Sequence, residues 1–270
     1  MYVRPPVAAD LRAWDAYGWR TEPDPTHADH EHAAFRAELE RAGATVEIGS
    51  ARAPDDPDAI YAYDPVLLTD AGAILLRPGK EGRRAEPDVV AADLTAAGIA
   101  IAGRMEAPAT AEGGDLFWLD RSTLLAGRGY RTNDDGITQL REMLGGAVDV
   151  VAFDLPHFRG PEKCLHLMSF ISPLDVDLVV AYLPMIPVRL LEILRARDIR
   201  VIQVPDEEFA SMGPNVLALG PRIALALAGS LETRRRMEAA GVDVRTYEGN
   251  EISIKGEGGP TCLTRPLERG

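Results

Sequence analysis

One arrangement recurs five times along the chain: a helix-like segment, a small residue and then a strand-like run. The five junctions read "ERAGATVEI", "LTAAGIAIAGR", "MLGGAVDVVAF", "LRARDIRVIQV" and "MEAAGVDVRTY". A small residue at this point is typical of a helix C-cap that needs positive φ. We therefore predict this backbone conformation at five positions, namely Gly43, Gly98, Gly146, Asp198 and Gly241.

A second pattern precedes each helix: an apolar run, a tight turn and another apolar run, as in two paired strands. "DPVLLTDAGAILLRPG" is the clearest copy, and "GDLFWLDRSTLLAGRGY", "LHLMSFISPLDVDLVVAYLP" and "NVLALGPRIALALAG" repeat it. The fifth copy is split, because "PTCLTRPL" supplies its first strand while "MYVRPP" and a helix over residues 31–42 supply the rest. Repeats of about 50 residues define an architecture. The sequence thus predicts an α/β fold of five pseudo-symmetric ββαβ units that close into a propeller, with residues 1–270 in a single domain.

The composition narrows the class of partner. The 270 residues are 46% apolar and 26% charged, and the formal net charge is −13. Nucleic-acid binding needs basic stripes, so this charge argues against a nucleic-acid partner, whereas it is compatible with a small cation. No apolar run approaches the roughly 18 residues of a membrane span, and the first residues lack the apolar region of a secretory signal. Two cysteines that lie far apart in the sequence do not make a disulfide framework. We therefore expect a cytoplasmic protein without a membrane partner.

If the units form a ring, the residues that open the first strand of each unit should converge on the ring axis. Those residues are polar or nucleophilic, and they recur at spacings of 48, 54, 49 and 47 residues. They are Asp64, Glu112 (with Asp115 close by), His166, Asn215 and Cys262. The sequence therefore predicts one cavity that gathers a thiol, an imidazole and several carboxylates.

This set of groups suits a guanidine substrate. Carboxylates match a planar guanidinium in bidentate geometry, and a nearby cation promotes formation of the nucleophilic thiolate. Asp64 and Glu112 would hold the guanidinium while Cys262 attacks its central carbon and His166 acts as acid and base. The intermediate would be a covalent thiouronium on Cys262. Water would then release a ureido product, whereas an amine in its place would make the protein a transferase.

The motifs, in their order, resemble the guanidine-modifying superfamily called penteins, which includes dimethylarginine dimethylaminohydrolases, arginine deiminases and amidinotransferases. "PDAIYAYDPVLLTDAGAILLRPGKEGRRAE" is similar to the guanidine-binding segment of that family, and "EGGD", "GRGYRTNDDGITQL", "LHLMS" and "GGPTCLT" match its later motifs. The resemblance covers nearly the whole chain. It implies the pentein fold, a small cationic guanidino compound as the partner, and neither metal nor organic cofactor; a homodimer is left open.

The resemblance also implies roles by position. Cys262 would be the nucleophile, His166 the acid and base, and Glu112 the carboxylate partner of the imidazole and a guanidine ligand. The residues that would bind substrate are Asp64 and Asp58 on the guanidine side, Arg83 and Arg131 at an α-carboxylate, and Asp115. Of the adjacent Arg83 and Arg84, only one should reach the substrate. The stretch from residue 11 to residue 25, which contains Trp14, Tyr17 and Trp19, lies where the family has a mobile lid.

The activity favoured by the sequence is hydrolysis of an arginine-like guanidine, as in the dimethylarginine dimethylaminohydrolases, giving a ureido product such as citrulline and an amine. Arginine deiminase or dihydrolase activity, which releases ammonia, and amidino transfer to a second amine are the alternatives. Tyr63 stands where the dimethylarginine hydrolases would have an acid, so the substituents on the guanidine stay open. Met168, in "HLM", leans away from the deiminases and transferases, which often have Asp there. A non-catalytic member of the fold need not keep the cysteine, histidine and carboxylate that are all present here.

Several residues also have simpler interpretations. Cys164 is expected to be structural, and Asp58 in "DDPD" fits a solvated loop as well as a ligand site. Asn215 is expected to secure backbone turns. Three histidines at near-helical spacing resemble a metal site, but without further ligands a solvated helix face is the expectation for His27, His30 and His32.

Overall fold

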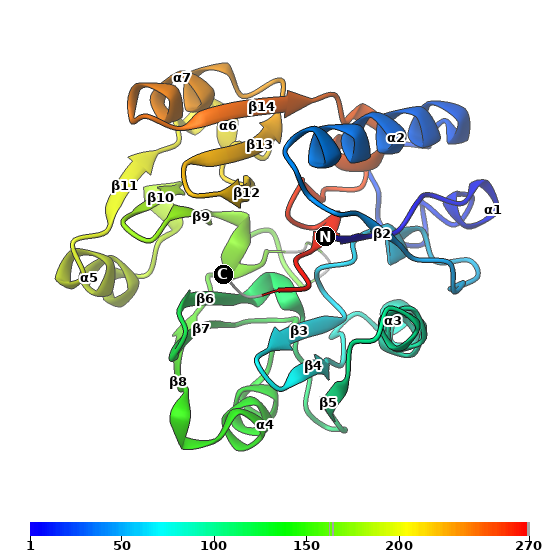
Figure 1. Ribbon diagram of the computed structural model, residues 1–270, viewed down its shortest axis with the longest axis horizontal. Coiled ribbons are helices and arrows are strands. Elements are labelled where there is room, and N and C mark those ends of the chain that lie inside the picture. The colour runs from blue at the N-terminus through cyan, green and yellow to red at the C-terminus, as the bar shows by residue number, and fades with distance from the viewer. Residues whose placement is uncertain (162, 164, 269–270) are drawn as a thin grey trace.

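In the computed structural model, which describes residues 1–161, 163 and 165–268, five three-stranded sheets surround a common axis (Figure 1). In each sheet the first strand pairs antiparallel with the middle strand, and the middle strand pairs parallel with the third. Four sheets are continuous in sequence: β3 (Val66–Thr69), β4 (Gly72–Leu75) and β5 (Ile101–Arg104); β6 (Leu116–Asp120), β7 (Thr123–Arg128) and β8 (Asp149–Asp154); β9 (Ile171–Asp175), β10 (Leu178–Ala181) and β11 (Arg200–Gln203); β12 (Leu217–Gly220), β13 (Ile223–Leu227) and β14 (Asp243–Tyr247).

The fifth sheet closes the ring. It consists of β15 (Thr264–Arg265), β1 (Tyr2–Val3) and β2 (Glu47–Ile48), and Tyr2 of β1 pairs with Arg265 of β15. The first and last strands of the chain, β1 and β15, therefore lie near the middle of the ring in Figure 1. The predicted five ββαβ units, one of them split between the two ends of the chain, are confirmed.

A helix links the middle and third strands of every unit and lies toward the outside of the ring (Figure 1). These helices are α3 (Glu86–Ala96), α4 (Asp134–Leu144), α5 (Val188–Ala196), α7 (Leu231–Ala239) and α2 (Pro25–Arg41). Two shorter helices, α1 (Ala8–Leu11) and α6 (Asp206–Phe209), lie in connecting segments. The helix starts have local causes: Asp24 caps α2 by accepting from Thr26 N at 2.9 Å, and Asn133 caps α4 by accepting from Gly136 N at 2.8 Å.

The helix ends follow the predicted pattern with one exception. Positive φ occurs at four of the five predicted residues, Gly43, Gly98, Asp198 and Gly241. The prediction for Gly146 was wrong, because α4 ends one residue earlier and Gly145 takes the C-cap with φ of 64°. In a Gly-Gly pair either residue can adopt this conformation without a steric cost, so the sequence does not decide between them.

Apolar side chains fill the space between each sheet and its helix. All four residues of β10 are buried, and α5 turns Leu190 and Leu194 toward that sheet. Burying one leucine side chain stabilises the fold by about 1.5–3 kcal/mol. The same cluster includes Phe117 and Leu125 of the preceding unit, so the core also joins neighbouring units. On α2, His27 and His30 are exposed as expected, but His32 is only 2% exposed and lies near Phe35. The expectation of a solvated face was therefore wrong for His32.

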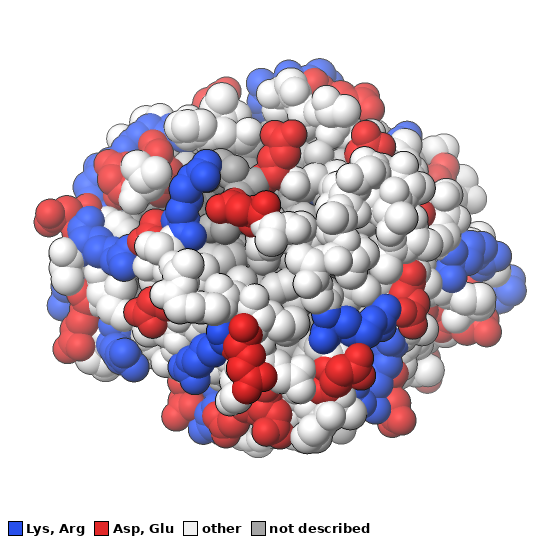
Figure 2. All heavy atoms as spheres, turned by 60° about the horizontal axis from the view of Figure 1, so that its bottom comes forward, with Lys and Arg blue, Asp and Glu red and all other residues white. Residues whose placement is uncertain are grey.

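The surface carries both signs of charge. On the face shown in Figure 2, acidic and basic side chains lie side by side around a broad uncharged area. The net charge of −13 is thus not gathered into one acidic patch on this face. In the part of the chain that the structure describes, no helix combines the length and the apolar character needed to cross a bilayer.

Candidate active site

The residues that precede the five first strands meet at one end of the ring axis. Asp64 comes before β3, Glu112 before β6, His166 before β9, Asn215 before β12 and Cys262 before β15. Contacts between side chains join them in two groups, one around His166 and one around Cys262. A single pocket of about 60 Å³ is lined by both groups.

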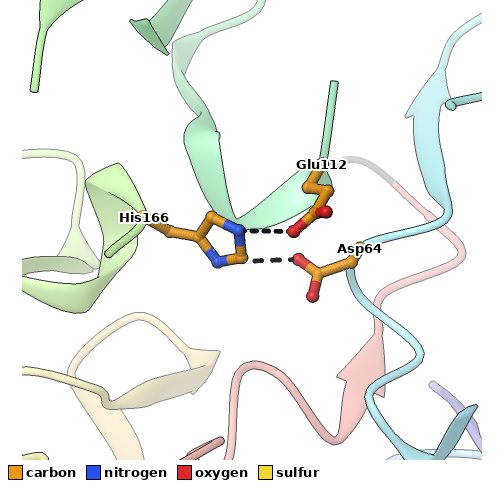
Figure 3. Close-up of side chains that lie close together, drawn as sticks. All are labelled: Asp64, Glu112 and His166. Carbon is orange, nitrogen blue, oxygen red and sulfur yellow. Dashed lines mark hydrogen bonds and ion pairs between the residues drawn. The ribbon is translucent and has the colours of Figure 1, made fainter. Parts of the chain in front are cut away.

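His166 lies between two carboxylates (Figure 3). Its Nε2 is 2.8 Å from Glu112 Oε2, and its Nδ1 is 3.9 Å from Asp64 Oδ1. The backbone around the ring is fixed as well, because His166 N donates to Ser169 Oγ at 2.9 Å. The imidazole is therefore oriented by acidic groups on both of its nitrogens, an arrangement that stabilises a protonated ring. The three side chains also offer ligand atoms within 4.8 Å of one another, close enough to share a metal ion.

The motif "EGGD" brings these groups together because both glycines lie in contact with the site. A Cβ on Gly114 would lie 2.3 Å from His166 Nδ1, and one on Gly113 would lie 2.1 Å from the backbone oxygen of Tyr63. Gly114 N also donates to Asp64 Oδ1 at 2.9 Å. Any larger residue at either position would push the imidazole and Asp64 apart.

Glu112 is fully buried and ionised. Burial alone would raise the pKa of its carboxyl group, but Arg131 and His166 together hold that pKa well below its usual value. Arg131 Nη1 donates to Oε1 at 3.0 Å and to Oε2 at 3.1 Å, and Lys80 N donates to Oε1 at 3.2 Å. A buried carboxylate with this many donors keeps its charge at neutral pH and can stabilise a neighbouring imidazolium.

Cys262 leaves a glycine-rich turn and is half-buried. A Cβ on Gly259 would lie 2.5 Å from Asn215, so the glycine lets Asn215 approach the turn. Asn215 Nδ2 then donates to Cys262 Sγ at 3.4 Å, and its Oδ1 accepts from Thr261 N at 3.1 Å. Asn215 thus secures the turn, as expected, and also contacts the thiol. Burial, reinforced by the charge of Asp64, raises the pKa of the Cys262 thiol to about 11.

Asp58 and Asp64 face the same pocket and are both buried. Asp58 accepts from Trp19 Nε1 at 2.8 Å and from Lys80 Nζ at 2.5 Å, so it is not a residue of a solvated loop. Asp64 accepts from Gly114 N and from Arg83 Nη1. Each carboxylate has about four acceptor positions, which leaves capacity for a further donor.

Arg83 is buried and lines the pocket, whereas Arg84 is exposed. Arg83 Nη1 donates to Asp64 Oδ2 at 2.6 Å, and Arg83 Nη2 donates to Glu86 Oε2 at 2.9 Å. Glu86 and Asp64 more than offset the cost of burial and raise the pKa of the Arg83 guanidinium well above its usual value. In this state Arg83 is an anchor for Asp64; its contact with an α-carboxylate stays a prediction.

Asp115 lies behind the site and does not line the pocket. Its Oδ2 accepts from Thr132 Oγ1 at 2.6 Å, and its Oδ1 accepts from Leu167 N at 3.0 Å. In place of the expected substrate contact, the geometry gives Asp115 a positioning role, because it ties the residue after His166 to the residue after Arg131.

Residues 11–25, which were expected to lie where the family has a lid, contribute to the wall of the pocket. Tyr17 and Gly18 line the mouth, and Trp19 is buried against Asp58. Lys80 Nζ donates to Tyr17 O at 2.7 Å, which holds the segment over the site. Movement of this segment stays a prediction. Cys164 lies outside the described residues.

Two contributors to the site were missed from the sequence, Lys80 and Glu86. A usable signal exists for Lys80. Because a middle strand runs antiparallel to the first strand, residues that follow β4 return to the end of the ring where β3 begins. Lys80 follows β4 in the same way that Arg131 follows β7. Glu86 has no such signal, since it begins helix α3 and only the fold turns it inward.

The chain is similar to known proteins over most of its length. A family model described as N,N dimethylarginine dimethylhydrolase, eukaryotic, matches residues 20–267. The N(G),N(G)-dimethylarginine dimethylaminohydrolase of Streptomyces coelicolor is 31% identical over 256 residues, which are 88% of this chain and 89% of that protein.

Two solved structures share the fold at low sequence identity. A mutant of the Pseudomonas aeruginosa dimethylarginine dimethylaminohydrolase complexed with citrulline matches with a TM-score of 0.79 and 24% identity over 97% of this chain and 96% of that one. The N-terminal domain of a cyanobacterial arginine dihydrolase, bound to product, matches with a TM-score of 0.85 and 20% identity over 99% and 96%. Both matches bear on the fold alone, and they agree with the propeller of five units.

Proposed function

The chain belongs to the dimethylarginine dimethylaminohydrolase family, and from this premise we propose how its pocket hydrolyses an arginine-like guanidine. The observation that carries the proposal is one pocket lined by the Cys262 thiol, the His166 imidazole and the Asp64 carboxylate. The substrate class is a small guanidino compound, the first candidate is a methylated arginine, and the products are a ureido compound such as citrulline and an amine. Residues 1–270 act as one guanidine-modifying domain.

The carboxylates of Asp58 and Asp64 bind the guanidinium side of the substrate. Both are buried and line the pocket, and both are hydrogen-bonded to cationic side chains that hold them in place. A guanidinium presents parallel N–H groups to carboxylates, which makes this pairing directional as well as charged. Arg131 is the better placed residue for an α-carboxylate, because it lines the pocket and its own partner Glu112 lies behind it.

The substrate itself activates the nucleophile. With a pKa of about 11, Cys262 is a thiol at neutral pH in the empty pocket. A guanidinium between Sγ and Asp64 would offset the carboxylate charge that disfavours the thiolate, so the thiol loses its proton to solvent when the cation is bound and His166 keeps its own. The Asn215 N–H group that points at Sγ stabilises the same anion.

The reaction then has two halves. In the first, Sγ forms a bond to the central guanidine carbon, the bond from that carbon to the substituted nitrogen breaks, and His166 gives a proton to the departing amine. In the second, water adds to the carbon of the thiouronium, His166 takes a proton from that water, and the C–S bond breaks to release the ureido product. Glu112 stabilises the charged imidazolium before the first proton transfer and again after the second.

The substituents on the guanidine depend on position 63. Tyr63 turns away from the catalytic pocket, and the Arg265 guanidinium lies 4.2 Å from the centre of its ring. No carboxylate therefore enters the pocket from this position, in contrast to the acid expected in the dimethylarginine hydrolases.

The half-buried free thiol of Cys262 supports a reducing compartment such as the cytoplasm as the place of action.

A substrate panel tests the activity. Purified protein would be incubated with asymmetric dimethylarginine, monomethylarginine, arginine, agmatine and a guanidino acid, with the Cys262→Ala variant as the matched control. We expect citrulline and dimethylamine in equal amounts from dimethylarginine, measured by a ureido assay and by chromatography of the amine. No ureido product from any of the compounds would overturn the proposal.

The same panel separates the alternative activities. Higher kcat/KM on arginine with release of ammonia would make the protein a deiminase or a dihydrolase. Formation of an amidino product only when an amine such as glycine is added would make it an amidinotransferase. Both outcomes would keep the Cys262 intermediate. A deiminase would release ammonia in place of the substituted amine in the first half, and a transferase would use an amine in place of water in the second.

A further inference from the structure

A second and larger pocket lies at the other end of the ring axis, where the five first strands end. Its volume is about 450 Å³, within the range of about 300–1,000 Å³ that is usual for small-molecule sites. Every first strand contributes to its wall, including Leu68 of β3, Phe117 of β6, Leu174 of β9, Leu217 of β12 and Arg265 of β15. The wall is mostly apolar, and Arg265 is the charged group within it that is buried.

Arg265 is a buried cation whose guanidinium is incompletely paired. The residue is 3% exposed, and its Nε is buried without a hydrogen-bond partner. Within the described residues, no carboxylate oxygen lies within 4.0 Å of its nitrogens. The Tyr63 ring covers one face of the guanidinium at 4.2 Å. Burial lowers the pKa of Arg265, and its interaction with the Tyr63 side chain and the charge of Asp64 only partly oppose that effect.

The acidic residues around this pocket do not supply the missing counter-charge. Asp120 forms an ion pair with Arg197, and Asp175 lies 3.0 Å from Arg222 Nε. Glu268 also lines the pocket but is exposed. A buried guanidinium without a carboxylate costs several kcal/mol, and an anion that enters the pocket would remove most of that cost.

We propose that this second pocket binds a small apolar carboxylic acid, with its carboxylate at Arg265 and its hydrocarbon part against Phe117 and Leu217. Arginine presents paired N–H donors that match a carboxylate, and the apolar wall gives the hydrocarbon part a surface that excludes water. The catalytic pocket is lined by carboxylates and also by Lys80, Arg83 and Arg131, so it suits a guanidino compound that carries both charges, whereas the second pocket suits an anion alone. The inference does not depend on the proposed reaction.

Calorimetric titration with 4-phenylbutanoate tests the proposal, with the neutral 4-phenylbutanamide as the matched probe. We expect one saturable site for the acid and at least tenfold weaker binding of the amide. Arg265→Met keeps the aliphatic stem and removes the charge, so acid binding should weaken at least tenfold and approach that of the amide. The same substitution at the exposed Arg195 is the control and should leave binding unchanged.

A second variant separates binding in this pocket from binding elsewhere. Ala218 lines the pocket, and Ala218→Trp would fill it with an indole ring, so both probes should lose binding. Citrulline, a product of the proposed reaction, should not displace the acid. Circular dichroism of both variants checks that they are folded, and Ala218→Trp carries the test if Arg265→Met is not. No saturable binding of the acid, equal affinity for acid and amide, or unchanged affinity in the folded variants would each overturn the proposal.

Discussion

The two ends of the ring axis are built from the same five strands and differ in almost every property. At the end where the first strands begin, buried carboxylates, arginines, a histidine and a thiol share one small pocket. At the end where they finish, the pocket is larger and its wall is mostly apolar around the single buried cation Arg265. Each first strand follows a polar residue and consists mainly of apolar residues. Polar groups therefore gather at one end of the axis, and apolar side chains line the other end.

Connection length explains the difference. At the far end, first and middle strands are joined by tight turns, such as residues 70–71 between β3 and β4 and residues 121–122 between β6 and β7. At the catalytic end, long segments such as 204–216 and 248–263 lead from a third strand to the next first strand. Only long segments can turn side chains back toward the axis, so the functional groups lie on them. The following predictions test this division, from the largest expected effect to the smallest.

The largest effect should come from Cys262→Ala. Without a nucleophile the covalent route is lost, so kcat should fall by about 10⁴-fold or more. Dimethylarginine should still bind, because the carboxylates that hold the cation are intact. Turnover by the ureido assay and the Kd from calorimetric titration check both points. Ordinary turnover would show that the end of the axis rich in polar groups is not where the reaction occurs.

His166→Ala should cost about 10²–10⁴-fold in kcat, the usual contribution of a positioned acid and base. The reaction should stop at or before the thiouronium, because no group remains to protonate the amine or to activate water. Intact-protein mass spectrometry after mixing with substrate measures the covalent adduct. The exposed His30→Ala is the matched control. Normal product formation by His166→Ala would contradict the assignment.

Asn215→Ala should have a smaller effect, localised to the thiol. Loss of the N–H group that lies 3.4 Å from Sγ removes one hydrogen bond to the thiolate, which is worth up to about tenfold in its population. The pH profile of the rate of Cys262 alkylation by iodoacetamide should shift to higher pH. Asn250→Ala, at an exposed asparagine, is the control. An unchanged alkylation profile would show that Asn215 holds the Thr261 backbone and does not stabilise the thiolate.

The fold could be predicted from the sequence because it repeats. Five copies of one pattern reinforce each other, so the error at Gly146 shifted one helix end and changed nothing else. The candidate site followed from the same register, since Asp64, Glu112, His166 and Cys262 open equivalent strands. Repetition therefore predicts where a residue lies along the axis.

Repetition says little about side-chain contacts made by the connecting segments. The pairing of Arg83 with Asp64 and Glu86, the inward position of Asp115 and the contact of Lys80 with Asp58 all join different segments of the chain. Each depends on how the connecting segments fold rather than on the repeated pattern. Arg265 in the second pocket was missed because its neighbour Tyr63 comes from another unit.

The smallest effect on activity should come from outside both pockets. Burial lowers the pKa of His32 on α2 to about 3, and its Nε2 has no hydrogen-bond partner. Below pH 6.5 the unfolded chain protonates this ring while the folded chain does not, so the free energy of unfolding falls as the pH decreases toward 3. His32→Leu removes this dependence and should gain about 2 kcal/mol relative to the original chain between pH 7.5 and pH 5. Urea unfolding at both pH values measures the gain, with His30→Leu as the control, and kcat at pH 7.5 should not change. An equal difference in stability at the two pH values would contradict a buried neutral His32, and a loss of kcat would show that the outer ring is coupled to the catalytic end.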